Sequence, residues 1–239
     1  KAECSAGATC THSLNELGGQ TILLSNITQD ITLTFNGIGD KNGVYAVTAT
    51  GELIAYDDAA VDATCLGVIL ITDNQKIMIA KNDATDGTNT TLYWGYNLQG
   101  KDVAGITETT NSNSAKADFN GKANTAAIIA AYTEHSVVMD ARDMCSVLQT
   151  FNDGENNGSF TDWYIPSAGQ LYEIYTNRTA IDEALTAIGG TVYRNDFYWG
   201  SSECNANTGW YVTFNNGNVY NGGKDNYFYA VRFVRDYNE

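Results

Sequence analysis

The run from Trp210 to Asn215 most constrains the fold, because apolar and other side chains alternate along it with a period of two. Trp210, Val212 and Phe214 alternate with Tyr211, Thr213 and Asn215. A strand with this pattern buries one face and leaves the other face to solvent or to a partner. The sequence therefore predicts a half-buried sheet near the C-terminus, with Val231 and Val234 in a final strand.

The turns and the free face of this region have an unusual composition. Residues 193–229 contain eight Asn and six Tyr, among Gly, Ser, Thr and Asp. Asn and Gly are ordinary turn residues, and Asn215-Asn216-Gly217 predicts a hairpin turn. A solvated loop gains nothing from aromatic surface, however. Tyr supplies stiff contact area and Asn supplies adaptable hydrogen bonds, so the mixture favours a ligand-binding face, as in an antibody combining site.

The charge balance narrows the class of partner. The chain has 13 basic and 28 acidic residues, for a net charge of −15, which opposes binding to phosphate backbones and to anionic lipid surfaces. We therefore expect no nucleic-acid partner. No run approaches the roughly 18 apolar residues of a membrane span, and the first residues lack the layout of a secretion signal. A leader that has been removed, and an extracellular, cell-surface or phage-particle location, fit this composition.

Cysteine and histidine spacing argues against the common metal sites. The five cysteines form no C-x-x-C pair; they are Cys4, Cys10, Cys65, Cys145 and Cys204. An odd count leaves at least one unpaired. Cys4 and Cys10 in a small loop are one alternative, and the apolar helical context of Cys145 favours a buried inert thiol. His12 and His135 are far apart in sequence, so zinc spacing is missing and we expect no metal and no cofactor.

Short β segments are expected through the first half of the chain. Apolar or alternating runs lie at 21–24, 31–35, 44–47, 53–56 and 91–94. The clearest prediction is a hairpin formed by 66–71 and 76–80, whose first strand is buried on both faces. Residues 1–18 are small and polar and predict an arm or the remnant of a leader, and residues 95–122 predict a long surface loop.

Helices are expected between these β segments and the C-terminal sheet. One begins at Asn124 or Thr125, and a second spans 140–148. Ser167 with Gln170 three residues later forms a capping-box pattern for a third. A fourth begins near Thr179 and ends at Gly189-Gly190. Strands, then helices, then strands predict an α+β fold with small antiparallel sheets and two to four helices.

Three motifs carry a resemblance to a known family. They are Trp163-Tyr164-Ile165-Pro166-Ser167, Tyr198-Trp199-Gly200-Ser201-Ser202, and Trp210-x-Val212-x-Phe214-x-x-Gly217 followed by Lys224 and Val231-Arg232. In this order they resemble C-type-lectin-fold proteins of the formylglycine-generating-enzyme branch, especially the variable proteins of diversity-generating retroelements from gut bacteria and their phages. The resemblance implies a lectin-like domain at 43–239 whose variable face lies in 193–229. It does not explain the first 40 residues, and the composition and β pattern alone predict an N-terminal arm and short β segment at 1–42.

The resemblance also implies roles for individual residues. The scaffold would include Trp199, Trp210, Phe214, Gly217, Lys224 and Arg232. The ligand-contacting face would consist of Asn205, Asn207, Tyr211, Thr213, Asn216, Asn218, Tyr220, Asn221, Asp225, Tyr227 and Tyr229. In that family Asn-type codons are altered at adenine, so surface positions of this kind differ between copies of the gene.

The chain departs from the catalytic and calcium-dependent relatives. Its one proline is Pro166, so the proline-centred calcium site of sugar-binding lectins is missing. The C-terminal stretch holds Cys204 without the second reactive cysteine of the formylglycine-generating oxidases. The run 153–158 imitates the beginning of a calcium loop, but Tyr164 stands where a bidentate Glu is required.

The remaining candidates for chemistry are weak, and we predict no enzymatic activity. A G-x-S-x-G motif is absent, and His12 or His135 would have to act as the base of any triad. The position of His135 near a helix end favours a solvated or capping role. Arg194 and Lys224 leave two alternatives, a clamp for a carboxylate ligand or a structural ion pair.

Two functions from different classes follow. The first is a non-catalytic binding protein that displays a diversifiable Tyr- and Asn-rich surface to a cell-surface protein or glycan. The alternative is a structural or adhesive subunit of a surface appendage or phage tail, with a fixed C-terminal domain. In that case the β-rich first part mediates assembly and forms oligomers through strand exchange.

Overall fold

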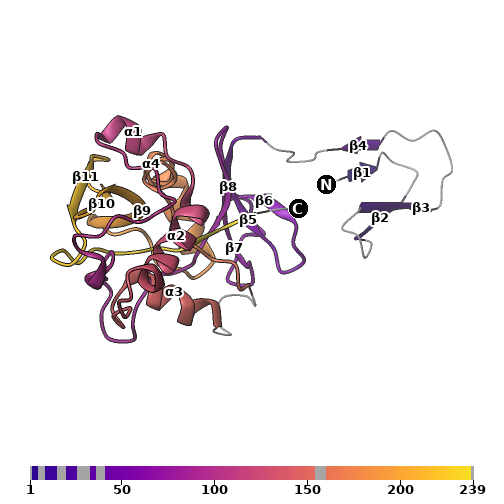
Figure 1. Ribbon diagram of the computed structural model, residues 1–239. Helices are drawn as coiled ribbons and strands as arrows, with labels where there is room; N and C mark the ends of the chain where they lie inside the picture. The colour runs from indigo at the N-terminus through magenta and orange to yellow at the C-terminus, as the bar shows by residue number, and fades with distance from the viewer. Residues whose placement is uncertain are drawn as a thin grey trace. The chain divides into compact units, whose positions relative to one another are not determined.

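A computed structural model describes residues 2–4, 9–14, 20–25, 33–35, 41–153 and 160–237 (Figure 1). The chain divides into two compact units between Lys41 and Asn42. In the N-terminal unit, β1 (Ala2–Cys4) pairs with β4 (Leu33–Phe35), and β2 (Thr9–Leu14) pairs with β3 (Gln20–Ser25), all antiparallel. Strands β1 and β2 lie within the segment for which the sequence predicted only an arm.

The C-terminal unit has a mixed architecture that confirms the α+β prediction. Its five-stranded antiparallel sheet has the order β12-β8-β7-β5-β6, and its three-stranded antiparallel sheet has the order β11-β10-β9. The strands are β5 (Gly43–Val47), β6 (Leu53–Ala55), β7 (Gly67–Ile71), β8 (Lys76–Ile79), β9 (Phe197–Asn205), β10 (Thr208–Thr213), β11 (Val219–Gly223) and β12 (Val234–Asp236). The α-helices are α1 (Ser112–Lys116), α2 (Gly121–Glu134), α3 (Met144–Asp153), α4 (Ala168–Thr176) and α5 (Arg178–Ala187).

The β7–β8 hairpin forms as predicted. Strand β7 is buried along its whole length, because β5 and β8 flank it on both sides and its side chains on both faces are apolar. The last strand, β12, returns to pair with β8, with Val234 opposite Ile79. The C-terminal stretch therefore contributes to both sheets of the unit.

Helix α4 begins where the sequence predicts. The side-chain oxygen of Gln170 accepts the Ser167 backbone N–H at 3.0 Å, and the Ser167 hydroxyl accepts the Gln170 N–H at 3.5 Å, which together form a capping box. After α5, Gly189 takes a φ of 73°, a left-handed conformation that glycine adopts at low cost. Both of these helix boundaries follow from local chemistry.

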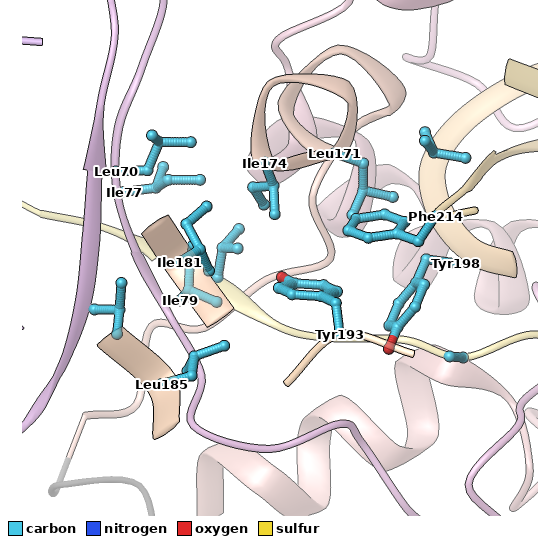
Figure 2. Packing of buried hydrophobic residues seen from close by; sticks show 14 of the residues in the cluster. Leu70, Ile77, Ile79, Leu171, Ile174, Ile181, Leu185, Tyr193, Tyr198 and Phe214 are labelled. Carbon is cyan, nitrogen blue, oxygen red and sulfur yellow. The ribbon is translucent and has the colours of Figure 1, made fainter. Parts of the chain in front are cut away.

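The two helices join the sheets into one hydrophobic core. Helix α4 contacts β9 and β10, whereas α5 contacts β5 and β7. Figure 2 shows Leu70 and Ile77 on one side, Phe214 and Tyr198 on the other, and Ile174 and Leu171 of α4 among them. Tyr193 stacks on Phe214 with ring centroids 4.6 Å apart. The three-stranded sheet is thus held rigidly along one of its faces.

Two regions differ from the sequence-based expectation. Residues 91–94 form no named strand; Leu92 and Tyr93 make isolated bridges to Tyr229 and Asp143. Residues 95–122 contain a 3-10 helix (Tyr96–Leu98), the whole of α1 and the beginning of α2. Helix α1 is a fifth α-helix among the described residues, one more than predicted. The sequence analysis did not predict α1 because its residues are mostly polar and lack apolar periodicity. The sequence signal for this helix is its N-cap residue, Asn111.

Cys145 is a buried free thiol, as predicted, and Cys65 and Cys204 are buried free thiols too. Of the sequence 153–158 that resembles a calcium loop, Asp153 ends α3 and residues 154–158 lie outside the described residues. The side chains of Cys4 and Cys10 also lie outside the part that the structure describes.

Candidate functional site

The exposed side of the three-stranded sheet is built on one row of aromatic residues. Tyr211 of β10 lies opposite Trp199 of β9 and opposite Tyr220 of β11. Residues directly opposite one another in antiparallel strands project to the same face. Along this row Trp199 is fully buried, Tyr211 is half-buried and Tyr220 is 50% exposed, so aromatic surface emerges toward the sheet edge.

The segment that follows β11 adds two more tyrosines to this row. Tyr229 is fixed by its bridge to Leu92, and its ring centroid lies 4.5 Å from that of Tyr211 and 4.6 Å from that of Trp199. Tyr227 lies 5.7 Å from Tyr229 and is 49% exposed. These separations are those of directly packed aromatic rings.

Phe197, at the beginning of β9, completes the cluster. Its ring centroid lies 5.0 Å from that of Tyr229 and 5.5 Å from that of Tyr211, and the residue is 38% exposed. We use the term aromatic platform for five residues: Phe197, Tyr211, Tyr220, Tyr227 and Tyr229. The exposed members rest on buried rings, so their positions are set by packing.

Gly222 of β11 makes room for these rings. A Cβ atom at this position would lie 3.1 Å from Trp199 and 3.4 Å from both Tyr211 and Tyr227. A side chain here would force those rings to shift, because a 3.1 Å approach is closer than ordinary van der Waals contact. Gly222 therefore lets the strand backbone and three aromatic rings share one small volume.

Burial keeps the central tyrosines of the platform neutral. Desolvation is the main cause that raises the pKa of Tyr211 and the pKa of Tyr229 above the ordinary tyrosine value. Both phenols therefore stay protonated at physiological pH. The platform offers aromatic faces and phenol groups without phenolate charge at its centre.

The basic residues near the platform are structural. Arg194 forms an ion pair with Asp83 at 3.1 Å, and the ammonium group of Lys224 bonds to the buried carboxylate of Glu203 and, at 2.8 Å, to the Lys101 carbonyl. Burial lowers the pKa of Lys224 and raises the pKa of Glu203, while their direct bond opposes both shifts. The sequence left two alternatives for Arg194 and Lys224, a clamp for a carboxylate ligand or a structural ion pair. In the structure both residues form ion pairs.

The structure separates the eleven expected contact residues into different places. Tyr211, Tyr220, Tyr227 and Tyr229 come together in the platform. Asn205 and Asn207 lie at the β9–β10 turn, and Asn216 and Asn218 at the β10–β11 turn. Because a six-residue strand is roughly 20 Å long, the two turns lie at opposite ends of β10. Seven of the eleven are exposed, namely Asn205, Asn207, Asn216, Asn218, Tyr220, Asn221 and Tyr227, and Asp225 is half-buried.

Three of these residues differ from the expected exposed face. Thr213 is only 3% exposed, because its hydroxyl bonds to the Asn216 side chain and accepts the Asn218 N–H at 3.2 Å. Tyr229 is 8% exposed and forms the floor of the platform. Asn221 is exposed, but it lies opposite Trp210 and therefore on the other side of β11 from Tyr220. Local turn bonding and strand alternation decide these placements.

Within residues 193–229, sequence reasoning missed two exposed aromatic residues, Phe197 and Phe228. Phe228 is 40% exposed and lies on Tyr93, with ring centroids 4.5 Å apart. The guanidinium carbon of Arg142 lies 3.9 Å from the Phe228 centroid. The exposure of Phe197 could have been predicted, because it alternates with Tyr198 along the strand. The position of Phe228 could not, because it depends on Tyr93 and Arg142, which are distant in sequence.

The expected scaffold residues are buried. Trp199, Trp210, Phe214, Lys224 and Arg232 are each at most 2% exposed. Gly217 has a φ of 73°, and a Cβ there would lie 2.2 Å from the Tyr175 ring. Glycine is therefore required at the β10–β11 turn both for the backbone conformation and for space.

A separate cavity of about 680 Å³ is lined by residues 100–106 together with Glu108, Glu134, His135 and Glu203. His135 follows α2, and its Nε2 lies 2.9 Å from the Asp102 carbonyl oxygen. The Glu203 carboxylate at this cavity is already bonded to Lys224 and to the Val103 N–H. In the described part of the chain, no three His, Cys, Asp or Glu side chains are grouped so that they could hold a metal ion.

No protein-family model and no curated protein matches the chain. Among solved structures, it is similar to a fimbrial protein from Bacteroides ovatus ATCC 8483, with a TM-score of 0.58 and 16% sequence identity over 82% of this chain. The match covers 49% of that protein, so this chain spans about half of its length. At this identity the likeness shows the fold. No helix in the described ranges is long and apolar enough to cross a membrane.

Proposed function

We propose that this chain is an adhesive subunit of an extracellular surface appendage, and that the aromatic platform of its C-terminal unit captures the ligand. The observation that carries the proposal is the exposure of Phe197, Tyr220 and Tyr227 on a row of buried rings. Isolated exposed apolar residues are common, but a contiguous group on a rigid support is typical of a binding surface. The rings are held before binding, so little side-chain entropy is lost when a partner docks.

The fold similarity to a fimbrial protein supports the appendage part of this proposal. Subunits of an appendage must join their neighbours, and a small strand-rich N-terminal unit supplies backbone for strand pairing between copies. The lectin-like character of the C-terminal unit remains part of the proposal, on the motifs described above. The function needs no covalent chemistry and no cofactor.

The location is tested on intact cells that produce the protein. Antibodies raised against the full chain should label filaments or the outer surface in immunogold electron microscopy. Light scattering of the purified full chain should show oligomers that grow with concentration. Label confined to the cell interior, together with a strictly monomeric chain, would contradict the appendage proposal.

Ligand capture is tested with the full chain coupled to beads and presented to a panel of bacterial and cultured animal cells. The variant Tyr220→Ala/Tyr227→Ala should lose capture, because truncation of a central aromatic anchor typically costs about 2 kcal/mol or more. The matched control is Val138→Ala/Val192→Ala, which removes exposed apolar side chains (80% and 46% exposed) from outside the platform. Equal capture by both variants and by the wild type would exclude the platform as the adhesive surface.

A diversified binding protein is the second candidate. Its support is that seven of the eleven expected contact residues are exposed, which permits substitution at little cost in stability. Sequencing of the 3′ end of the gene across many isolates should then show changes at adenines in the codons of these seven, and constancy at Thr213 and Tyr229. An invariant set of codons would leave a fixed adhesin.

A further inference from the structure

The rings of the platform differ from other rings of the molecule in what lies over them. Elsewhere a cation covers a ring face: Arg142 lies 3.9 Å from the Phe228 centroid, Arg232 lies 4.2 Å from Tyr193, and Lys116 lies 4.0 Å from Tyr172. Over the five platform rings, no such cation comes from any residue that the structure describes. The face of an aromatic ring carries partial negative charge, so the exposed platform rings still offer this attraction to a cation from outside the chain.

Among the charged residues near the platform in sequence, only the acidic ones are available to a ligand. Asp196 and Asp225 are both partly exposed. The two basic residues of 193–229, Arg194 and Lys224, are held in the ion pairs described above. An anionic ligand would therefore find no available counter-charge from this stretch, whereas a cation would find two carboxylates and a chain of net charge −15.

The spacing of the rings decides how a cation could bind. The Tyr211 and Tyr229 centroids are 4.5 Å apart, and the Phe197 centroid lies 5.0 Å from that of Tyr229. Rings in direct contact leave no space for an ammonium or guanidinium group between them. Cations must instead lie on the outer faces, and the rings exposed there are spread over β9, β11 and the segment after β11. Several separate positions favour an extended basic surface over one small cation.

We propose that the aromatic platform captures a partner protein through Lys or Arg side chains that lie over Phe197, Tyr220 and Tyr227 and close to Asp196 and Asp225. This inference rests on the proposed function and adds the chemistry of the ligand. Arginine suits the site better than lysine, because its planar guanidinium group stacks on aromatic faces and is more weakly hydrated. Electrostatic attraction then steers the partner, and the stacked side chains fix it.

The test uses the full chain and two peptides, octa-arginine and its neutral isostere octa-citrulline. Octa-arginine is attracted to any acidic protein, so the comparison must hold net charge constant. Tyr220→Leu/Tyr227→Leu does so, because it removes two ring faces and keeps apolar bulk. Isothermal titration should show that this variant binds octa-arginine about five- to thirtyfold more weakly than the wild type does. Octa-citrulline should bind both proteins far more weakly.

A second pair of variants tests the carboxylates at matched charge. Asp196→Asn/Asp225→Asn and Asp57→Asn/Asp58→Asn each remove two negative charges, and Asp57 and Asp58 are exposed residues of the segment that follows β6. The Asp196/Asp225 variant should bind octa-arginine more weakly than the Asp57/Asp58 variant does. Circular dichroism spectra like that of the wild type would show that all variants remain folded.

The outcomes separate this inference from the proposed function. If the Leu variant binds octa-arginine as tightly as the wild type does, only the overall charge attracts the peptide and the basic-partner proposal is overturned. If cell capture depends on the platform but is blocked by a neutral oligosaccharide and not by octa-arginine, the ligand is a glycan; the inference fails and the adhesive function stands. If platform variants leave cell capture unchanged, the proposed function itself fails.

Discussion

The two faces of the three-stranded sheet carry the same kinds of side chain, but one face is buried and the other is partly exposed. On one face, Tyr198 and Val219 lie opposite Val212, and all three are buried in the core that includes Leu171 and Ile174 of α4. On the other face, the row that ends at Tyr220 passes from complete burial to 50% exposure. Aromatic content therefore does not distinguish the core from the proposed binding surface. What covers the ring does: α4 packs against the first face, whereas Tyr220 and Tyr227 on the second keep about half of their surface exposed.

The largest effect is expected on the covered face. Phe214 is 1% exposed, and its ring packs on Tyr193 and Tyr198 with centroids 4.6 Å away in each case. Phe214→Ala should lower the free energy of unfolding by about 3–5 kcal/mol, because it leaves a cavity in a core that cannot collapse fully. Urea denaturation measures this. A loss below about 1 kcal/mol would show that the fold does not depend on the packing of Phe214.

The next effect concerns the charged pair beside the platform. Lys224→Met leaves the Glu203 carboxylate buried without its cation, which should cost about 3 kcal/mol or more. The double variant Lys224→Met/Glu203→Gln should regain most of that loss, since no uncompensated charge remains. Both are measured by urea denaturation. A double variant no more stable than the single one would mean that the pair acts through packing rather than through charge.

The sequence could predict the covered face and much of the fold that supports it. Alternation identified β10, continuous apolar character identified the β7–β8 hairpin, and the Ser167/Gln170 pair located α4. These signals are local, so they survive without any knowledge of neighbours. The short helix α1 and the bridges at Leu92 and Tyr93 depend on partners far along the chain, and no local pattern encodes them.

The open face was only partly predictable, for the same reason. The exposure of Tyr220 and Tyr227 follows from position and composition. The burial of Thr213 depends on a hydroxyl bond within its turn, and the burial of Tyr229 depends on the bridge to Leu92. Phe197 and Tyr211 belong to one cluster because three segments meet there. A sequence therefore indicates that an exposed aromatic face exists more readily than it indicates which residues compose it.

Alkaline pH should weaken the covered face through Tyr198. Burial, followed by the charge of Asp83, raises the pKa of Tyr198 from 10.0 to about 12. Because the folded pKa is the higher one, the stability that the neutral phenol contributes is complete below pH 10 and is lost as the pH rises toward 12. This rise in pKa corresponds to about 3 kcal/mol.

The test for Tyr198 compares slopes rather than single values. The free energy of unfolding is measured between pH 8 and pH 11 for the wild type and for Tyr198→Phe, which has no phenol to titrate. Other buried tyrosines contribute equally to both proteins. The wild-type curve should therefore fall more steeply above pH 10, and parallel curves would show that Tyr198 does not contribute.

The smallest effect on stability is expected at the open end of the aromatic row. Tyr220→Ala should change the free energy of unfolding by no more than about 0.5 kcal/mol, as for other surface substitutions, whereas Tyr211→Ala should cost about 1–3 kcal/mol because its ring packs on four others of the cluster. Urea denaturation of both variants gives the comparison. If Tyr220→Ala costs as much as Tyr211→Ala, the exposed ring supports the fold and has little left to offer a ligand. If the two differ as expected, Tyr220 is retained in a position where folding does not require it, and its value to the protein lies in what it touches outside the chain.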